Sequence, residues 1–510
     1  MKSVSSTALR CQSIPRLLAW IRVIRRPYFI LSLLAAAFVG PLANGADTYV
    51  TTPPPPAAAA NASLLNTWLR DQSPIFNAWD MGGQIRARYE IKEDGGSFPN
   101  RDFRRTGVDN DNSYFLLREI IHLGYSPSPW FTIFAEARDS SSTGDDRNPN
   151  PESDQFDLHQ AFIRLGDPAK FPLTAKIGRQ ELIYGEERLI GTADWGNIPR
   201  VFDAAKLRFE NPVLWLDAFA SRVVLPVDHH FNMPNDYDWF SGLYASSSAL
   251  IPKQETQLYF LSRNASAQAA AAVPGSLVSL PSARDILTFG LRVRSLPGQW
   301  NGWDYAAEIA GQLGSINVSN RRLDHEALAA TAGGCYTWAK AFGSPRIGLE
   351  YNFASGDHDS TDGKNQTFDN LFPSNHRLYG YMDLISWRNI HNPRLTASIK
   401  PIPPLLLTVD YHLFWLADTH DFFYPITGPA RGASGPAAPG EPVSYGRNPQ
   451  FSSFVGSELD LDATYTVNRW ANLRIGYGHF FVGDYIRDSL ASVGGATDAD
   501  FLYIQTTFNF

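Results

Sequence analysis

The fold is decided by the stretch Gln84-Ile85-Arg86-Ala87-Arg88-Tyr89-Glu90-Ile91. Every second position of this stretch is Ile, Ala or Tyr, and the positions between them are Gln, Arg or Glu. Because successive side chains of a β-strand point to opposite faces, the alternation predicts a strand with one apolar and one charged face. Lipid on the apolar side and water on the charged side would produce this pattern in a transmembrane β-barrel.

The same alternation recurs along the chain as far as Phe510. Leu291 and Val293 alternate with Arg292 and Arg294, and similar patterns fill residues 394–400, 458–463 and 501–510. The segments are about ten residues long, which is the length that a tilted transmembrane strand needs. A soluble all-β solenoid or propeller is the alternative, but it would show a fixed repeat period, and the sequence has none.

The connections between these segments alternate in length. Short turns are predicted near Pro127–Pro129, Asp167–Pro172, Asn211–Pro212, Ile251–Lys253, Pro297–Gly302, Gly343–Pro345, Pro401–Pro404 and Asn468–Ala471. Long polar loops are predicted near residues 92–112, 139–154, 185–201, 226–238, 264–284, 315–326, 355–391, 417–452 and 484–499. Short periplasmic turns and long external loops are typical of outer-membrane barrels. We therefore predict an all-β, antiparallel up-and-down barrel of 18 strands with both termini on the short-turn side.

The N-terminal region predicts export to the outer membrane of a Gram-negative-type bacterium. Residues 1–45 carry six Lys or Arg and no acid around an apolar run too short to span a bilayer, as in a signal peptide. Residues 46–62 form a Pro/Ala-rich linker, and residues 63–81 form a short periplasmic leader with enough periodic apolar content for one helix. Residues 82–510 form the barrel. Arg25-Arg26 leaves a twin-arginine export signal as the alternative.

Charge and cysteine content exclude several classes of protein. Loss of the signal peptide leaves 38 of the 44 Lys and Arg against 51 Asp and Glu, so the formal net charge changes from −7 to −13 and nucleic acid is not an expected partner. Cys335 is then the only cysteine, which excludes a disulfide framework. The histidines lack the spacing of a metal site, so no metal and no cofactor is expected. The acidic stretch 357–363 is a candidate for a loop Ca²⁺ site, although it lacks the bidentate Glu of an EF-hand.

Two further stretches resemble a known family. Residues 178–191 read Gly-Arg-Gln-Glu-Leu-Ile-Tyr-Gly-Glu-Glu-Arg-Leu-Ile-Gly and are followed by Asp194-Trp195, Asn197, Arg200 and Phe202-Asp203. Together they are similar to a signature of alginate-export family porins. Residues 368–376, with Tyr379-Gly380 and Trp387-Arg388-Asn389-Ile390, resemble a second block of that family. The resemblance covers about residues 80–510. It implies an 18-stranded outer-membrane channel, whose best-known members pass the polyanion alginate through an arginine-rich lumen.

Positive charge fixed in a water-filled lumen would attract an anionic solute. By alternation, the inward-facing candidates are Arg86, Arg88, Arg118, Arg138, Lys206, Arg208, Arg292, Arg294, Arg394, Lys400 and Arg474. The alternative is that these cations pair with lumen carboxylates, for which the candidates are Glu90, Glu136, Asp304, Glu308, Glu350, Asp410, Glu458, Asp460 and Asp462. A mixed-charge polar lumen is expected in either case.

The family-motif loop carries the other candidate residues: Gly178, Arg179, Gln180, Arg188, Asp194, Trp195, Arg200 and Asp203. One interpretation is a loop that folds into the pore as a constriction. The alternative is a loop anchor in which Arg188, Asp194, Arg200 and Asp203 form salt bridges.

These observations predict passive passage of anionic solutes, such as alginate-like polyuronates or acidic oligosaccharides. The alternatives are a general porin or a porin for another substrate, a barrel enzyme, and an adhesin or structural barrel. No Gly-x-Ser-x-Gly motif is present, so no catalytic residue is assigned. The expected partners are outer-membrane lipid, the anionic solutes themselves, and a periplasmic protein that contacts the leader at residues 46–81.

Overall fold

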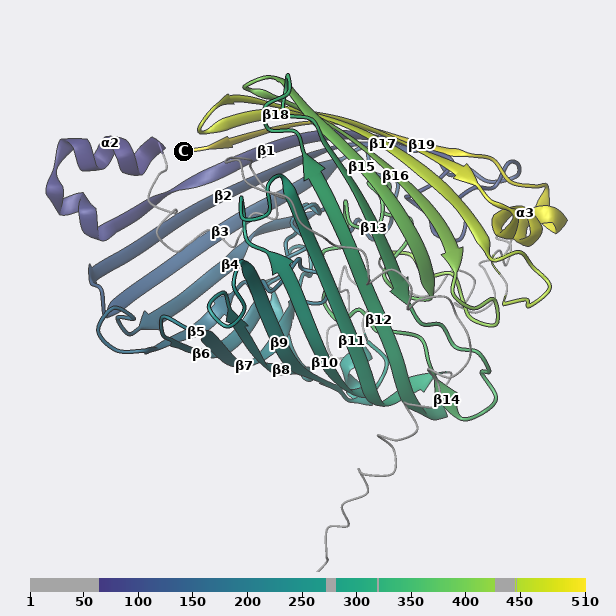
Figure 1. Cartoon of the computed structure of the whole chain (residues 1–510), viewed down its shortest axis with the longest axis horizontal. Helices are drawn as coiled ribbons and strands as arrows, with labels where there is room; N and C mark the ends of the chain where they lie inside the picture. Colours follow the sequence, from purple (N-terminus) through teal and green to yellow (C-terminus); the bar gives the residue numbers. More distant parts are fainter. Residues whose placement is uncertain (1–63, 272–280, 319–320, 427–444, 446) are drawn as a thin grey trace, which may run out of the picture. The chain divides into compact units, whose positions relative to one another are not determined.

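The computed structural model describes residues 64–271, 281–318, 321–426, 445 and 447–510, all of which belong to one compact unit. The signal peptide and the linker predicted for residues 1–62 lie outside the described residues. Eighteen antiparallel strands form a closed barrel in which each strand pairs with its neighbours in sequence (Figure 1). The first and last strands close the ring through the register Gln84↔Asn509. The predicted fold class and strand number are confirmed.

The barrel strands run in sequence order around the ring, and the nineteenth strand, β14, is a two-residue segment inside a loop. Their bounds are β1 Trp79–Glu93, β2 Asn112–Ser128, β3 Phe131–Thr143, β4 Asp154–Leu165, β5 Leu173–Gln180, β6 Phe202–Glu210, β7 Trp215–Leu225, β8 Met233–Ser247, β9 Gln254–Ala265, β10 Arg284–Ser295, β11 Trp303–Val318, β12 Arg321–Thr337, β13 Arg346–Ala354, β14 Lys364–Asn365, β15 Ile390–Ile402, β16 Leu405–Leu416, β17 Phe454–Asn468, β18 Ala471–Val482 and β19 Ala499–Asn509.

Side-chain exposure follows the predicted alternation. In β1, Ile85 and Tyr89 are 39% and 41% exposed, whereas Arg86 and Arg88 are 4% and 1% exposed. The apolar face therefore points out of the barrel and the charged face points into it. This orientation suits lipid outside and polar groups inside.

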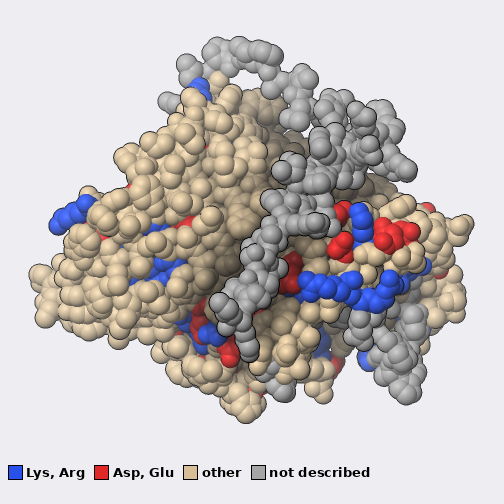
Figure 2. All heavy atoms as spheres, turned by 90° about the horizontal axis from the view of Figure 1, so that it is seen from below, with Lys and Arg blue, Asp and Glu red and all other residues tan. Residues whose placement is uncertain are grey.

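Exposed aromatic side chains lie near both ends of the barrel wall. Trp130, Phe171, Trp300 and Trp338 are exposed beside short turns, and Trp239 is exposed toward the long-loop end of β8. Such rings are typical of the two membrane interfaces, where one edge contacts lipid and the other contacts water. Figure 2 shows one outer face, most of which is formed by residues that are neither acidic nor basic.

The eight short turns lie where the sequence predicted them, but one predicted long loop is wrong. Residues 315–326 are mostly strand, because β11 continues to Val318 and β12 begins at Arg321, with these two residues paired. The polar residues of this hairpin indicated a loop. Several are exposed, and Arg322 pairs with Asp285 at 2.9 Å on the surface, so a strand exposed to water tolerates polar side chains.

A short helix, α2 (Leu64–Gln72), and a 3-10 turn, η2 (Pro74–Ala78), precede β1 within the stretch for which a leader was expected. Asn66 holds the helix to the start of β1, since its side chain donates to Asp80 at 2.6 Å and accepts from the Met81 amide at 2.7 Å. Strand β1 begins at Trp79, three residues before the expected start of the barrel. No helix among the described residues is long and apolar enough to cross a membrane.

The two ends of the barrel differ. Helix α2 and the C-terminus lie at one end, whereas α3 (Asp484–Leu490) and β14 lie in long loops at the other (Figure 1). The start of β1 and the end of β19 thus both lie on the short-turn side of the barrel, as predicted.

We expect the long-loop end to face the cell exterior. Thr361→Cys lies in an exposed part of a long loop, and Ala341→Cys lies in an exposed short turn, while the native Cys335 is buried. A membrane-impermeant maleimide should label Thr361→Cys in intact cells and should label Ala341→Cys only after the outer membrane is permeabilised. The reverse pattern would show that the barrel is inserted in the opposite orientation.

Candidate functional site

The loop between β5 and β6, residues 181–201, crosses the inside of the barrel. We call it the first inner loop. At one side, Glu186 Oε1 lies 2.7 Å from Arg292 Nη2 on β10, and at the other, the Trp195 carbonyl accepts from Arg88 Nη1 on β1 at 2.8 Å. Strands β1 and β10 are nine positions apart in the ring of eighteen and thus face each other across the barrel. The loop therefore spans the bore.

The Gly-Arg-Gln motif shapes the base of this loop. Gly178 has a φ of +126°, and a Cβ there would lie 2.2 Å from the Ala161 carbonyl oxygen on β4, so only glycine fits. The next residue, Arg179, contacts both carboxylate oxygens of Asp203, at 2.8 and 3.3 Å. Since Arg179 and Asp203 are paired across β5 and β6, this two-point contact fastens the strands where the loop begins and ends.

The loop between β13 and β15, residues 355–389, forms the second inner loop. Near its middle, the backbone carbonyl and amide of Asp369 form hydrogen bonds with the side-chain amide of Gln312 on β11, at 2.6 and 2.8 Å. Farther on, the Met382 amide donates to Glu458 on β17 at 2.8 Å. Burial raises the pKa of Asp369, but the neighbouring guanidinium groups of Arg284 and Arg263 outweigh this effect and lower it. The Asp369 carboxylate, which forms an ion pair with Arg284, is therefore charged.

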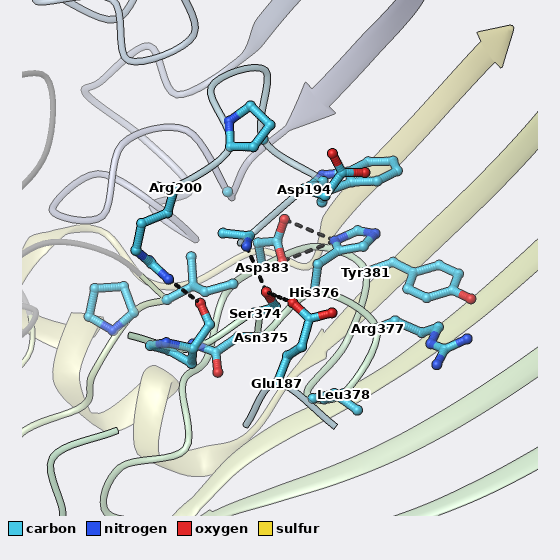
Figure 3. A pocket seen from close by; sticks show the side chains of 18 of the residues that line it. Glu187, Asp194, Arg200, Ser374, Asn375, His376, Arg377, Leu378, Tyr381 and Asp383 are labelled. Atoms are coloured by element: carbon cyan, nitrogen blue, oxygen red, sulfur yellow. Dashed lines mark hydrogen bonds and ion pairs between the residues drawn. The ribbon is translucent and has the colours of Figure 1, made fainter. Parts of the chain in front are cut away.

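The two inner loops join each other in the barrel interior (Figure 3). Ile190 and Phe372 form a parallel bridge in which the Phe372 amide donates to the Leu189 carbonyl at 2.9 Å and the Gly191 amide donates to the Phe372 carbonyl at 2.8 Å. The Glu187 carboxylate accepts from the Ser374 hydroxyl at 2.7 Å. The constriction is therefore one hydrogen-bonded body made from two loops.

An aromatic stack crosses this junction. The Trp195 ring lies between the Arg88 guanidinium, 3.8 Å from its centroid, and the His376 imidazole, which is parallel to it at 3.8 Å. Tyr381 stacks on the other side of His376 at 5.2 Å. Burial lowers the pKa of His376 despite its contact with Asp383, so the neutral ring is favoured in the stack.

A cavity of about 1970 Å³ lies beside the inner loops, and thirteen Lys or Arg and thirteen Asp or Glu are among its described lining residues. One wall, formed by β13 and β15 to β19, contributes four cations and three carboxylates. The cations are Arg346, Arg394, Lys400 and Arg474, and the carboxylates are Glu350, Asp410 and Asp462. Arg377 of the second inner loop also lines the cavity and extends away from the loop junction (Figure 3). The wall is thus slightly cationic within a balanced interior.

Hydroxyl and amide side chains lie among these charges on the same wall: Thr396, Ser398, Thr408, Thr464, Asn472, Gln505 and Thr507. They come from β15 to β19 and can donate or accept hydrogen bonds. This wall can therefore contact a solute that carries both hydroxyl groups and acids.

The predicted inward cations are salt-bridged. Ten have a carboxylate within 4.0 Å: Arg86 and Arg118 with Asp194, Arg88 with Glu90, Arg138 with Asp154, Lys206 and Arg208 with Asp217, Arg292 with Glu186, Arg294 with Glu255, Arg394 with Asp410, and Arg474 with Asp462. Of these ten, Arg86, Arg394 and Arg474 line the large cavity, as does Lys400. The structure therefore favours the alternative of charge pairing over free lumen cations.

The motif loop lies inside the barrel, and its four charged residues contact different partners. Arg188 contacts Glu350 at 2.8 Å, Asp194 contacts Arg118 at 2.8 Å, and Asp203 contacts Arg179. Arg200 instead donates to the Gly191 and Pro373 carbonyls at 2.8 and 3.0 Å, and burial lowers its pKa to about 10. The loop is thus a constriction held by separate contacts on several strands.

Sequence reasoning missed the role of the second inner loop and of Glu187, Arg346 and Arg377. The second family block was the only signal for this loop, and no pore role was assigned to it. In the candidate Ca²⁺ stretch, Asp359 accepts from the amide and hydroxyl of Thr361, and Asp362 accepts from the Lys364 amide. Calcium binding there stays a prediction.

The fold is similar to that of several solved proteins from Pseudomonas aeruginosa. OpdQ is 12% identical with a TM-score of 0.54, and the match covers 85% of this chain and 98% of that one. OccD3 (OpdP) is 14% identical with a TM-score of 0.52, covering 85% and 91% of the two chains. OpdO is 13% identical, also with a TM-score of 0.52, covering 85% and 97%. At these identities the likeness extends to the fold alone.

No curated protein matches the sequence. The sequence profile described as alginate export matches residues 78–498, which run from the residue before β1 to the residue before β19 and include both inner loops. This match confirms the resemblance noted in the motif loop, and the barrel is the fold that the resemblance implies. The chain therefore belongs to the alginate export family of outer-membrane channels.

Proposed function

We propose that this protein is a passive outer-membrane channel for hydroxylated anionic solutes, such as alginate-like polyuronates or acidic oligosaccharides. The observation that carries this proposal is the cavity wall of β13 and β15 to β19, where four arginine and lysine side chains lie among hydroxyls, amides and three carboxylates. A guanidinium matches the two oxygens of a carboxylate, and hydroxyl and amide groups match the hydroxyls of a sugar.

The pairing of the wall cations favours transport over tight binding. Arg394 and Arg474 each have a carboxylate partner, at 2.7 and 2.6 Å, yet both line the cavity. A carboxylate of a passing solute would contact the N–H groups of these arginines that face the cavity. The carboxylate already paired with each arginine would weaken this attraction. Conduction needs such weak and repeated sites, because a solute must also leave.

A general porin is the second candidate function. The equal numbers of cationic and anionic residues around the described cavity favour it, since a balanced interior gives little selectivity between small ions. Selectivity measurements distinguish the two functions directly. Our proposal includes no catalytic residue and no cofactor, in keeping with a channel family and fold.

The first test is the ion selectivity of the purified protein in a planar bilayer. We expect the wild-type pore to prefer Cl⁻ over K⁺ under a salt gradient, and we expect Arg377→Ser with Lys400→Ser to move the reversal potential toward cation preference. Both side chains line the cavity, so their removal lowers the local positive potential. The effect should weaken near 1 M salt, where the screening length is about 3 Å.

The matched control is Lys170→Ser with Lys340→Ser, which removes the same charge from exposed positions that do not line the cavity. It should leave the reversal potential unchanged. Oligouronates should block the wild-type current at concentrations where neutral oligosaccharides of equal length do not. A pore that prefers K⁺, or equal block by both sugars, would reject the anionic substrate and leave a general porin.

The second test concerns the inner-loop junction. Glu187→Ala removes the acceptor of the Ser374 hydroxyl and of the Thr192 amide, at 2.7 and 3.1 Å. Each hydrogen bond to a charged group contributes about 1.5–3 kcal/mol, so the closed junction should open more often. We expect a larger and noisier single-channel conductance.

The control for this test is Glu210→Ala, which removes an exposed carboxylate at the short-turn end of β6. It should conduct like the wild type. If Glu187→Ala also leaves conductance and current noise unchanged, the junction does not restrict the pore.

A further inference from the structure

Two histidines and an aspartate converge at the long-loop end of the barrel. His358 belongs to the second inner loop, whereas Asp418 and His420 follow β16. His358 Nδ1 lies 2.8 Å from one Asp418 carboxylate oxygen, and His420 Nδ1 lies 2.7 Å from the other. One ligand atom from each of the three residues lies within 4.8 Å of the other two. Folding thus creates a cluster that sequence spacing did not predict.

The backbone beneath this cluster is fixed. The Asn389 side chain accepts from the Asp418 amide at 2.8 Å and donates to the Asp418 and Phe422 carbonyls, both at 2.9 Å. The Asp357 amide donates to the Asp421 carboxylate at 3.0 Å, which joins the two chain segments directly. Asp418 is therefore held in place before any ligand arrives, and a preorganised site loses less entropy on binding.

The imidazole rings of His358 and His420 are exposed to solvent and can rotate. The side chains of His358 and His420 are 71% and 43% exposed. A tetrahedral ion with Zn–N distances of about 2.0–2.1 Å brings its ligand atoms to about 3.3 Å from one another. Small rotations of these exposed rings, which already contact Asp418 and each other, can close the difference from 4.8 Å.

The donor set identifies the class of ion. Two imidazole nitrogens and one carboxylate suit zinc, copper or nickel, whereas calcium prefers six to eight oxygen ligands. Asp359 lies near enough to both imidazoles to interact with them electrostatically. Its charge adds to the local attraction for a cation, while water can complete the coordination.

We propose that His358, Asp418 and His420 form a binding site for a divalent first-row transition-metal ion, which links the second inner loop to the segment after β16. The second inner loop also carries Phe372 and Ser374 of the constriction. The bound ion thus fixes the external part of a loop whose internal part narrows the pore.

The test is isothermal titration of the purified barrel with Zn²⁺, together with visible absorption after titration with Co²⁺, which reports the ligand geometry. We expect one site per chain in the wild type. His358→Ala with His420→Ala should weaken Zn²⁺ binding at least about 100-fold, the upper end of the loss caused by a supporting residue alone.

The matched control is His229→Ala with His230→Ala. These two exposed histidines lie in another long loop, where His229 Nε2 is 3.5 Å from Asp228. The control should bind Zn²⁺ like the wild type, and its circular dichroism and that of the test variant should match the native barrel. Absence of Zn²⁺ binding to the wild type, or an affinity that the test variant retains, would overturn the proposal.

Discussion

The closure of the sheet is the constraint on which the rest of the structure depends. In a hydrocarbon environment an unpaired backbone amide or carbonyl costs several kcal/mol, so a sheet must have no free edge. The pairing of β1 with β19 over Gln84↔Asn509 to Glu93↔Asp500 removes both edges at once. Closure also places alternate side chains outside the barrel, toward lipid, and inside it, toward polar groups. This separation explains the alternation of apolar and polar residues in the sequence.

Closure leaves an interior wide enough to need filling, and the two inner loops fill part of it. They are held mainly by charged groups because the inward face of each strand is polar. Arg292 and Arg88 on opposite walls contact Glu186 and the Trp195 carbonyl of the same loop. The inward-pointing arginines therefore mainly stabilise the barrel and its inner loops, and only some of them line the cavity.

The barrel could be predicted from the sequence because its signal is local. Ile85 and Arg86 point to opposite faces wherever a strand forms, and Pro403-Pro404 separate β15 from β16, because proline has no amide to donate to a neighbouring strand. The hairpin at residues 315–326 escaped prediction because polar residues are tolerated in strands that extend into water. The partners of the arginines also escaped prediction, since alternation gives the face of a side chain but not its neighbours. The contact of Glu187 with Ser374 and that of His358 with Asp418 depend on the folded loops.

The parallel bridge between the inner loops has a consequence for the order of assembly. Ala193 and Ser374, which are joined by a hydrogen bond at 2.6 Å, are 181 residues apart in sequence. Loop-closure entropy disfavours so remote a contact until the intervening strands have brought the ends together. In a barrel built strand by strand, the junction of the two inner loops would thus form only after β13 and β15 are in place, and the final narrowing of the lumen would be a late event in biogenesis.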